Sequence, residues 1–159
     1  MNIYRNWFLA SRPWSFSMTA ISVSVGGALA AIYGNFSWFL YLATLVGTVF
    51  LHAATNLLND YYDVKNGVDT QEVATAHYRP HPLVEGKLEA GHVRTAAYVL
   101  YGLSTLIGLY LAATRGWELM WIGLIGAFAS LTYTAPPLKY KYSALGEISV
   151  FLMWGPLMV

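Results

Sequence analysis

Long apolar segments separated by short polar links dominate this sequence and limit what it can fold into. They cover residues 14–33, residues 37 into an aspartate-bearing stretch near 60, and residues 95–113 and 117–134; a fifth begins near residue 145. About 20 helical residues cross the hydrocarbon core of a bilayer. Hydrophobic residues make up 57% of the chain and charged residues 11%, whereas a soluble domain carries about 25% charged residues. The sequence predicts an all-α, polytopic transmembrane helical bundle with about five membrane segments.

Charge and composition narrow the classes of function. The net charge is +1, and the lysines and arginines are scattered, which does not fit a nucleic-acid-binding surface. The chain has no cysteine, which excludes a disulfide framework, a thiolate metal site and a cysteine nucleophile. A secretory signal fits residues 14–33 poorly, because its apolar region spans about 7 to 15 residues.

The distribution of positive charge predicts the orientation in the membrane. Of the nine lysines and arginines, all but Arg115 fall on the side of the N-terminus, the aspartate-bearing stretch and the two polar loops. The positive-inside rule places that side in the cytoplasm. We therefore expect a multi-pass protein of the cell inner (plasma) membrane whose candidate site loops are cytoplasmic.

The second apolar segment ends in a stretch that holds all three aspartates of the chain, Asp60, Asp63 and Asp69. On a helix, an arc of roughly 60° carries four polar side chains, with Asp60 beside it: His52, Asn56, Asn59 and Asp63. Carboxylates at a helix C-terminus oppose the helix dipole, so a cation is expected there. Oxygen ligands without thiolates suit Mg²⁺, which proteins commonly share with substrate phosphates.

Three cations of the polar loops, Arg79, Lys139 and Lys141, are expected on the same side as the aspartates. Together these groups predict a metal-bridged phosphate or diphosphate site. A helix cap in headgroup water is the simpler interpretation of any single aspartate. For His52, at membrane depth, we expect a neutral imidazole hydrogen-bonded to a neighbouring helix; Asn56 is either an interhelical amide or a functional group.

Several motifs resemble those of the UbiA superfamily of intramembrane prenyltransferases. They are Asn-Asp-Tyr-Tyr-Asp at 59–63 with Gly-Val-Asp-Thr at 67–70, Arg-Pro at 12–13, Arg-Pro at 79–80 with Gly-Lys at 86–87, and Tyr-Thr-Ala-Pro-Pro-Leu-Lys-Tyr-Lys at 133–141. Leu-Gly-Glu at 145–147 and Trp-Gly-Pro at 154–156 most resemble the 1,4-dihydroxy-2-naphthoate branch, which makes menaquinone.

The resemblance implies a fold of about nine helices and transfer of a polyprenyl group from a polyprenyl diphosphate to an aromatic acceptor, which in the most similar branch is 1,4-dihydroxy-2-naphthoate. Asn59 and Asp63 would coordinate Mg²⁺ on the diphosphate, with Asp60 supporting them. In that scheme the metal ligands are Asn59, Asp60 and Asp63. The acceptors of other branches, 4-hydroxybenzoate, chlorophyll precursors or glycerol phosphate lipids, remain alternatives.

The same resemblance assigns roles to the cations. Arg79, Lys139 and Lys141 would bind the diphosphate and stabilise the charge that develops as it leaves. Residues 12 and 56 would bind substrate, Arg12 by holding an acceptor carboxylate. The expected catalytic set is Asp60, Asp63, Lys139 and Lys141.

One part of the family pattern is missing from this sequence. The family has a second aspartate-rich motif after the sixth helix, which binds another Mg²⁺, but no aspartate follows Asp69 here. We therefore expect residues 1–159 to be the N-terminal part of a single membrane prenyltransferase domain, with the C-terminal half missing. Two other hypotheses stay open: a small membrane transporter or ion-binding protein, and a half-length subunit that assembles with another chain or with itself.

We expect the 159-residue chain by itself to show no Mg²⁺-dependent prenyl transfer, because half of the metal site is absent. The assay is transfer from a labelled prenyl diphosphate by the purified chain in detergent; detectable product would refute this expectation. The intact mass of the protein in its source membranes tests the premise: a mass near 17.6 kDa would indicate a half-site that needs a partner or does something other than prenyl transfer, and a mass nearly twice that would indicate the rest of the enzyme.

Overall fold

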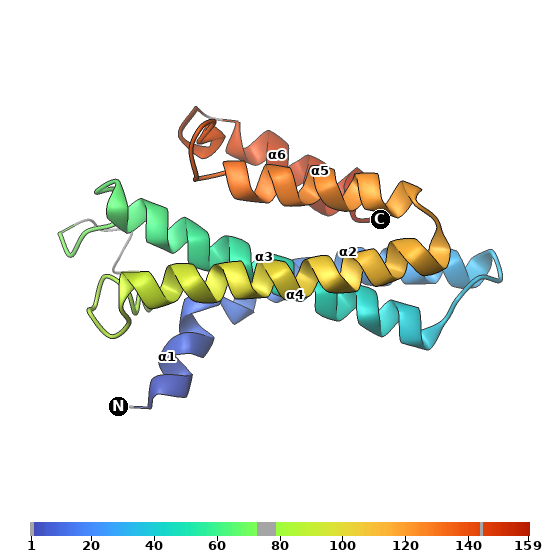
Figure 1. Ribbon diagram of the computed structural model, residues 1–159, viewed down its shortest axis with the longest axis horizontal. Coiled ribbons are helices and arrows are strands. Elements are labelled where there is room, and N and C mark those ends of the chain that lie inside the picture. Colours follow the sequence, from blue (N-terminus) through green and yellow to red (C-terminus); the bar gives the residue numbers. More distant parts are fainter. Residues whose placement is uncertain (1, 73–78, 144) are drawn as a thin grey trace.

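The computed structural model describes residues 2–72, 79–143 and 145–159, and every regular element in these ranges is helical (Figure 1). This confirms the predicted all-α fold. The elements in chain order are α1 (Ile3–Ala10), η1 (Pro13–Ser15), α2 (Phe16–Ile32), α3 (Trp38–Lys65), α4 (Ala90–Arg115), α5 (Glu118–Thr132), η3 (Tyr140–Ser143), α6 (Gly146–Leu152) and η4 (Met153–Leu157).

Three helical stretches are long and apolar enough to cross a membrane: Pro13–Ile32, Trp38–Lys65 and Ala90–Arg115. The fourth apolar segment forms α5, which has 15 residues and a length of about 22 Å. The fifth forms α6, with seven residues, and then a kinked turn at Gly155. All five predicted apolar segments are thus helical, and three of them reach spanning length.

The two long helices α3 and α4 lie side by side and form the centre of the bundle (Figure 1). Helix α2 packs on α3, and α5 packs on α4. Gly34 reverses the chain between α2 and α3 with φ +73°, a conformation that costs glycine little. The short α1 lies at an angle to these helices (Figure 1).

The buried apolar core lies between the C-terminal half of α3 and the N-terminal half of α4, and it reaches α1. It comprises Ala10, Ala54, Leu57, Leu58, Leu88, Val93, Ala97 and Tyr101. Many other large apolar side chains are exposed, as expected of helices whose outer surface contacts lipid or further protein. The core therefore fixes the end of α3 that carries the aspartates.

A close approach between α3 and α4 occurs at Gly47. A Cβ atom added there would lie 2.9 Å from Cγ2 of Ile107. At the same level Ser104 Oγ donates a hydrogen bond of 2.8 Å to the Gly47 carbonyl. Small residues and polar contacts of this kind hold helices together in lipid, where apolar burial gives no net drive.

Replacing Gly47 by alanine should destabilise the protein by about 1–3 kcal/mol, because the new methyl group overlaps a β-branched side chain that has little room to turn. The measurement is the thermal unfolding midpoint in detergent. Gly102→Ala on α4 is the matched control: nothing lies within 4 Å of its added Cβ, so helix propensity should raise stability by up to about 1 kcal/mol. Equal midpoints for the two variants would contradict the close approach.

Candidate functional site

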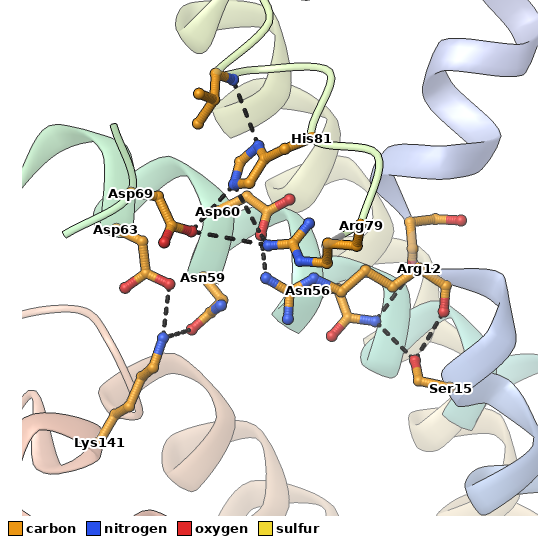
Figure 2. A network of polar contacts seen from close by, with 12 residues as sticks. Arg12, Ser15, Asn56, Asn59, Asp60, Asp63, Asp69, Arg79, His81 and Lys141 are labelled. Atoms are coloured by element: carbon orange, nitrogen blue, oxygen red, sulfur yellow. Dashed lines mark hydrogen bonds and ion pairs between the residues drawn. The ribbon is translucent and has the colours of Figure 1, made fainter. Parts of the chain in front are cut away.

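Two fully desolvated carboxylates, Asp60 and Asp63, lie at the C-terminal end of α3, and each is 2% exposed. Buried charges of this kind are retained only with partners, because their desolvation costs several kcal/mol. The helix dipole adds an unfavourable term at this end. Positively charged side chains around the two aspartates offset this cost (Figure 2).

Asp60 is paired with two arginines from distant parts of the chain. Arg79 Nη2 lies 2.9 Å from Asp60 Oδ1, and Arg12 forms an ion pair with the same oxygen. Arg12 is in the left-handed region with φ +57°, where it joins α1 to η1. This uncommon conformation turns the chain, and its guanidinium points toward α3 (Figure 2).

Asp63 and Asn59 contact the polar segment that follows α5. Lys141 Nζ lies 2.6 Å from Asp63 Oδ2 and 3.0 Å from Asn59 Oδ1. The hydroxyl of Tyr142 donates to Asp63 Oδ1 over 2.6 Å. Burial, together with that hydrogen bond, raises the pKa of Tyr142 to about 12, so the hydroxyl keeps its proton and donates at neutral pH.

The three predicted diphosphate cations do not converge on one point. Arg79 is bound to Asp60, whereas Lys141 is bound to Asp63 (Figure 2). Lys139 makes no ion pair with a described residue; its left-handed backbone, with φ +47°, turns the chain ahead of η3. The structure thus brings Lys141, but not Lys139, onto the aspartates.

Sequence reasoning left three site residues without a role: Tyr142, Asp69 and His81. The fully buried His81 has Nε2 3.1 Å from Asp69 Oδ2. One side-chain atom from each of Asp60, Asp69 and His81 lies within 4.8 Å of the others. A histidine between two prolines in a loop carries no periodic signal, so only the fold reveals this contact.

An apolar cavity of about 820 Å³ extends from this polar cluster between α2, α3, α4 and α5. Its polar end is lined by Arg12, Asn56, Asn59 and Lys141, among others. Apolar side chains and glycines of the four helices line much of the remainder. The cavity can therefore accept a molecule with a charged head and a long hydrocarbon part.

The two polar residues deeper on α3 bind neighbouring backbone and hydroxyl groups. Asn56 Nδ2 donates to the Ser11 carbonyl over 2.9 Å and to Ser15 Oγ over 3.2 Å. The His52 ring lies 2.8 Å from Thr19 Oγ1 on α2, which confirms the expected contact with a neighbouring helix. Both side chains also line the cavity, so Asn56 stays a predicted substrate ligand.

Both arginines keep unused donors. Within the described parts of the chain, Arg12 Nε and Arg79 Nη1 are buried and have no hydrogen-bond partner. Unsatisfied buried donors on a cation are costly. An anion that reached them would relieve this cost, which fits a phosphate-bearing ligand.

The donor set also fits a divalent cation. Asn59 Oδ1 and Asp63 Oδ2 both approach the single positive atom Lys141 Nζ, so two hard oxygens converge on one position. Oxygens of this kind suit Mg²⁺, which completes its shell with water and substrate phosphate. Asp60 is already held by two guanidinium groups and fits a supporting role.

A model of the UbiA prenyltransferase family matches residues 19–159. The chain belongs to this family. Its curated relatives include the 1,4-dihydroxy-2-naphthoate octaprenyltransferase of Bacillus subtilis (strain 168), which is 32% identical over 149 residues, covering 94% of this chain and 47% of that protein.

Eukaryotic relatives match at similar identity and coverage. UbiA prenyltransferase domain-containing protein 1 is 33% identical over 158 residues in Dictyostelium discoideum, covering 95% of this chain and 47% of that protein. The human protein of that name is 32% identical over 158 residues, covering 97% of this chain and 45% of its own length. The chain spans about half the length of the curated relatives that it matches.

Replacing Asp60 by asparagine should destabilise the protein by about 3–5 kcal/mol, because two buried guanidinium groups lose their shared counter-charge. The thermal unfolding midpoint in detergent measures this. Glu89→Gln is the control, because Glu89 pairs with His92 where both side chains are more than 70% exposed and such pairs contribute about 0–1 kcal/mol. An unchanged midpoint in the Asp60 variant would contradict the pairing.

Proposed function

We propose that this chain belongs to an enzyme that transfers a polyprenyl group from a polyprenyl diphosphate to an aromatic acceptor. The observation that carries the proposal is the position of Lys141, which binds Asn59 and Asp63 at the polar end of a large apolar cavity. A prenyl diphosphate has the same division into a charged head and an apolar tail. Membership in the UbiA prenyltransferase family supports this class of reaction.

The residues around the head would bind and orient the diphosphate. Lys141 and Arg12 line the cavity, and Arg79 reaches the same polar cluster through Asp60. Positive groups placed where charge develops lower the barrier to departure of diphosphate. The apolar walls would hold the prenyl chain and keep water from the reacting carbon.

Asn59 and Asp63 would hold Mg²⁺, with Asp60 supporting them through its arginines. When bound, the metal would neutralise diphosphate charge and so help it to leave. Tyr142 donates a hydrogen bond to Asp63 Oδ1, and Lys141 contacts Asp63 Oδ2 and Asn59 Oδ1. The carboxylates are thus oriented in advance.

The acceptor is proposed to be 1,4-dihydroxy-2-naphthoate, which would place the protein in menaquinone and other quinone biosynthesis. The name of the Bacillus subtilis relative, 1,4-dihydroxy-2-naphthoate octaprenyltransferase, supports this choice. Arg12 lines the cavity and has a buried Nε without a hydrogen-bond partner among the described residues, so it could bind a carboxylate. Asn56 would lie beside it.

The compartment and the rest of the protein are part of the same proposal. Three spanning helices support a membrane location, and the positive-inside count favours the inner (plasma) membrane with the site on the cytoplasmic side. Because the chain spans about half of its relatives' length, the second half of the site is proposed to come from a segment outside these residues.

A transporter is less well supported. Asp63 is the aspartate that would line a permeation path, and both of its oxygens are bound, one by Lys141 and the other by Tyr142. Fixed cations at that position oppose the passage of a cation. Diphosphate binding accounts for the same cations directly.

Lys141→Ala in the intact protein should lower prenyl transfer by about 100-fold or more, because a charge that faces the leaving group is lost. Lys139→Ala is the matched control, two positions earlier on the same segment. Because Lys141, and not Lys139, pairs with Asp63, this variant should keep activity within about threefold of wild type. The measurement is the rate of product formation from labelled prenyl diphosphate in membranes.

Two further variants complete the test. Asp63→Ala should abolish transfer, whereas His52→Ala, which loses contacts to Ser15 and Thr19, should mainly lower the unfolding midpoint. Full activity in the Asp63 variant would overturn the metal assignment. Equal losses of prenyl transfer in the Lys141 and Lys139 variants would contradict a specific role for Lys141.

A further inference from the structure

The polar loop after α3 contains a rigid turn centred on His81, which the proposed reaction does not yet use. His81 is fully buried, and so is Pro82. Pro80 and Pro82 flank it and restrict the backbone on both sides. Burying a polar imidazole in a loop costs free energy unless its nitrogens have hydrogen-bond partners, so the contacts of His81 with the two neighbouring carboxylates are informative.

Hydrogen bonds within residues 81–88 hold this turn in one shape. The His81 N–H donates to Glu85 Oε1 over 2.9 Å, and the Lys87 N–H donates to the Pro82 carbonyl over 2.8 Å. The Lys87 ammonium and the His81 N–H lower the pKa of Glu85, so this carboxylate stays charged at neutral pH. The arrangement resembles a capping box, with proline at the first position of the turn.

The contacts of the imidazole assign its tautomer. The Val84 N–H donates to His81 Nδ1 over 3.4 Å, so Nδ1 acts as an acceptor. The proton of a neutral ring then lies on Nε2, which is 3.1 Å from Asp69 Oδ2 and 3.8 Å from Asp60 Oδ1. His81 therefore donates to Asp69 from a fixed position (Figure 2).

Asp69 in turn faces the arginine of the same loop. Arg79 Nη2 lies 2.9 Å from Asp60 Oδ1 and 3.7 Å from Asp69 Oδ2, so one nitrogen is shared between the two carboxylates. The other terminal nitrogen, Nη1, is buried and without a hydrogen-bond partner in the described ranges. Holding Nη2 between two aspartates thus fixes the direction of Nη1.

A metal ion is a weaker explanation of the Asp60, Asp69 and His81 group. Its ligand atoms are close enough, but Asp60 already carries two guanidinium groups. A third cation there would meet like charges at short range. A histidine that donates to Asp69 needs no such ion.

We infer that His81 is a positioning residue, which holds Asp69 and, through it, fixes Arg79 beside Asp60 in the polar cluster that would bind the diphosphate of the prenyl donor. The inference rests on the proposed function. It extends that function to a residue outside the Asn-Asp-Tyr-Tyr-Asp motif at 59–63. It predicts an effect on donor binding and not on acceptor binding.

Two isosteric variants separate the functions of the two ring nitrogens. In His81→Asn the amide oxygen can still accept from the Val84 N–H, but the donor to Asp69 is lost. In His81→Gln the amide nitrogen reaches toward Asp69 and restores that donor. We expect His81→Asn to raise the KM for prenyl diphosphate by about tenfold or more, as loss of supporting contacts commonly does, while the KM for the acceptor changes by less than about twofold.

His81→Gln should return the donor KM to within about threefold of wild type, since the Asp69 contact is restored. A double-mutant cycle with Arg79→Ala supplies the decisive comparison. If His81 acts through Arg79, adding His81→Asn to the Arg79 variant should change the donor KM by less than about twofold. Additive effects, or equal rises in both KM values, would overturn the inference.

Direct binding of geranylgeranyl diphosphate with Mg²⁺ to the intact protein keeps this test separate from the proposed reaction. Donor binding that weakens in His81→Asn without any prenyl transfer by wild type would remove the proposed reaction and keep the positioning role. A wild type that binds no prenyl diphosphate would overturn both. If His81→Asn does not fold, the same cycle is run with Asp69→Asn, which removes the contact from the other side.

Discussion

Buried negative charge at the end of α3 is the constraint that most of the site depends on. Asp60 and Asp63 are each 2% exposed at a helix C-terminus, where both desolvation and the helix dipole oppose them. Their partners come from the segment before α2, the loop before α4 and the segment after α5, as Arg12, Arg79 and Lys141. Charge balance therefore joins three distant parts of the chain at one helix end.

The bundle below this site is held together differently. Lipid is as apolar as the helix surfaces, so close contacts and polar links replace the hydrophobic effect. The approach of α4 to Gly47 and the bonds of Asn56 to Ser11 and Ser15 are such links. They leave an apolar cavity of about 820 Å³ between the helices, open to the charged cluster at one end.

The charged cluster adjoins an apolar cavity, so the geometry and the family membership both support the proposed binding of a prenyl diphosphate. A prenyl diphosphate needs both environments within one molecule's length, and the structure has them adjacent. Rigid support matters as much as charge, because catalytic groups act when their positions are fixed before reaction. In the proposed enzyme, the hydrogen bond of Tyr142 to Asp63 and the contact of His81 with Asp69 would provide support of that kind.

The sequence by itself determined the helices and the position of the polar residues at the end of α3. Apolar length located five helical segments, and the 3.6-residue period placed Asn59, Asp60 and Asp63 at one helix end, because both signals are local. Only the tertiary structure decided which cation meets which carboxylate: Lys141 reaches Asp63, while Lys139 turns the chain. Loop side chains have no period that predicts their direction, so His81 and Tyr142 became visible only when the loops packed against α3.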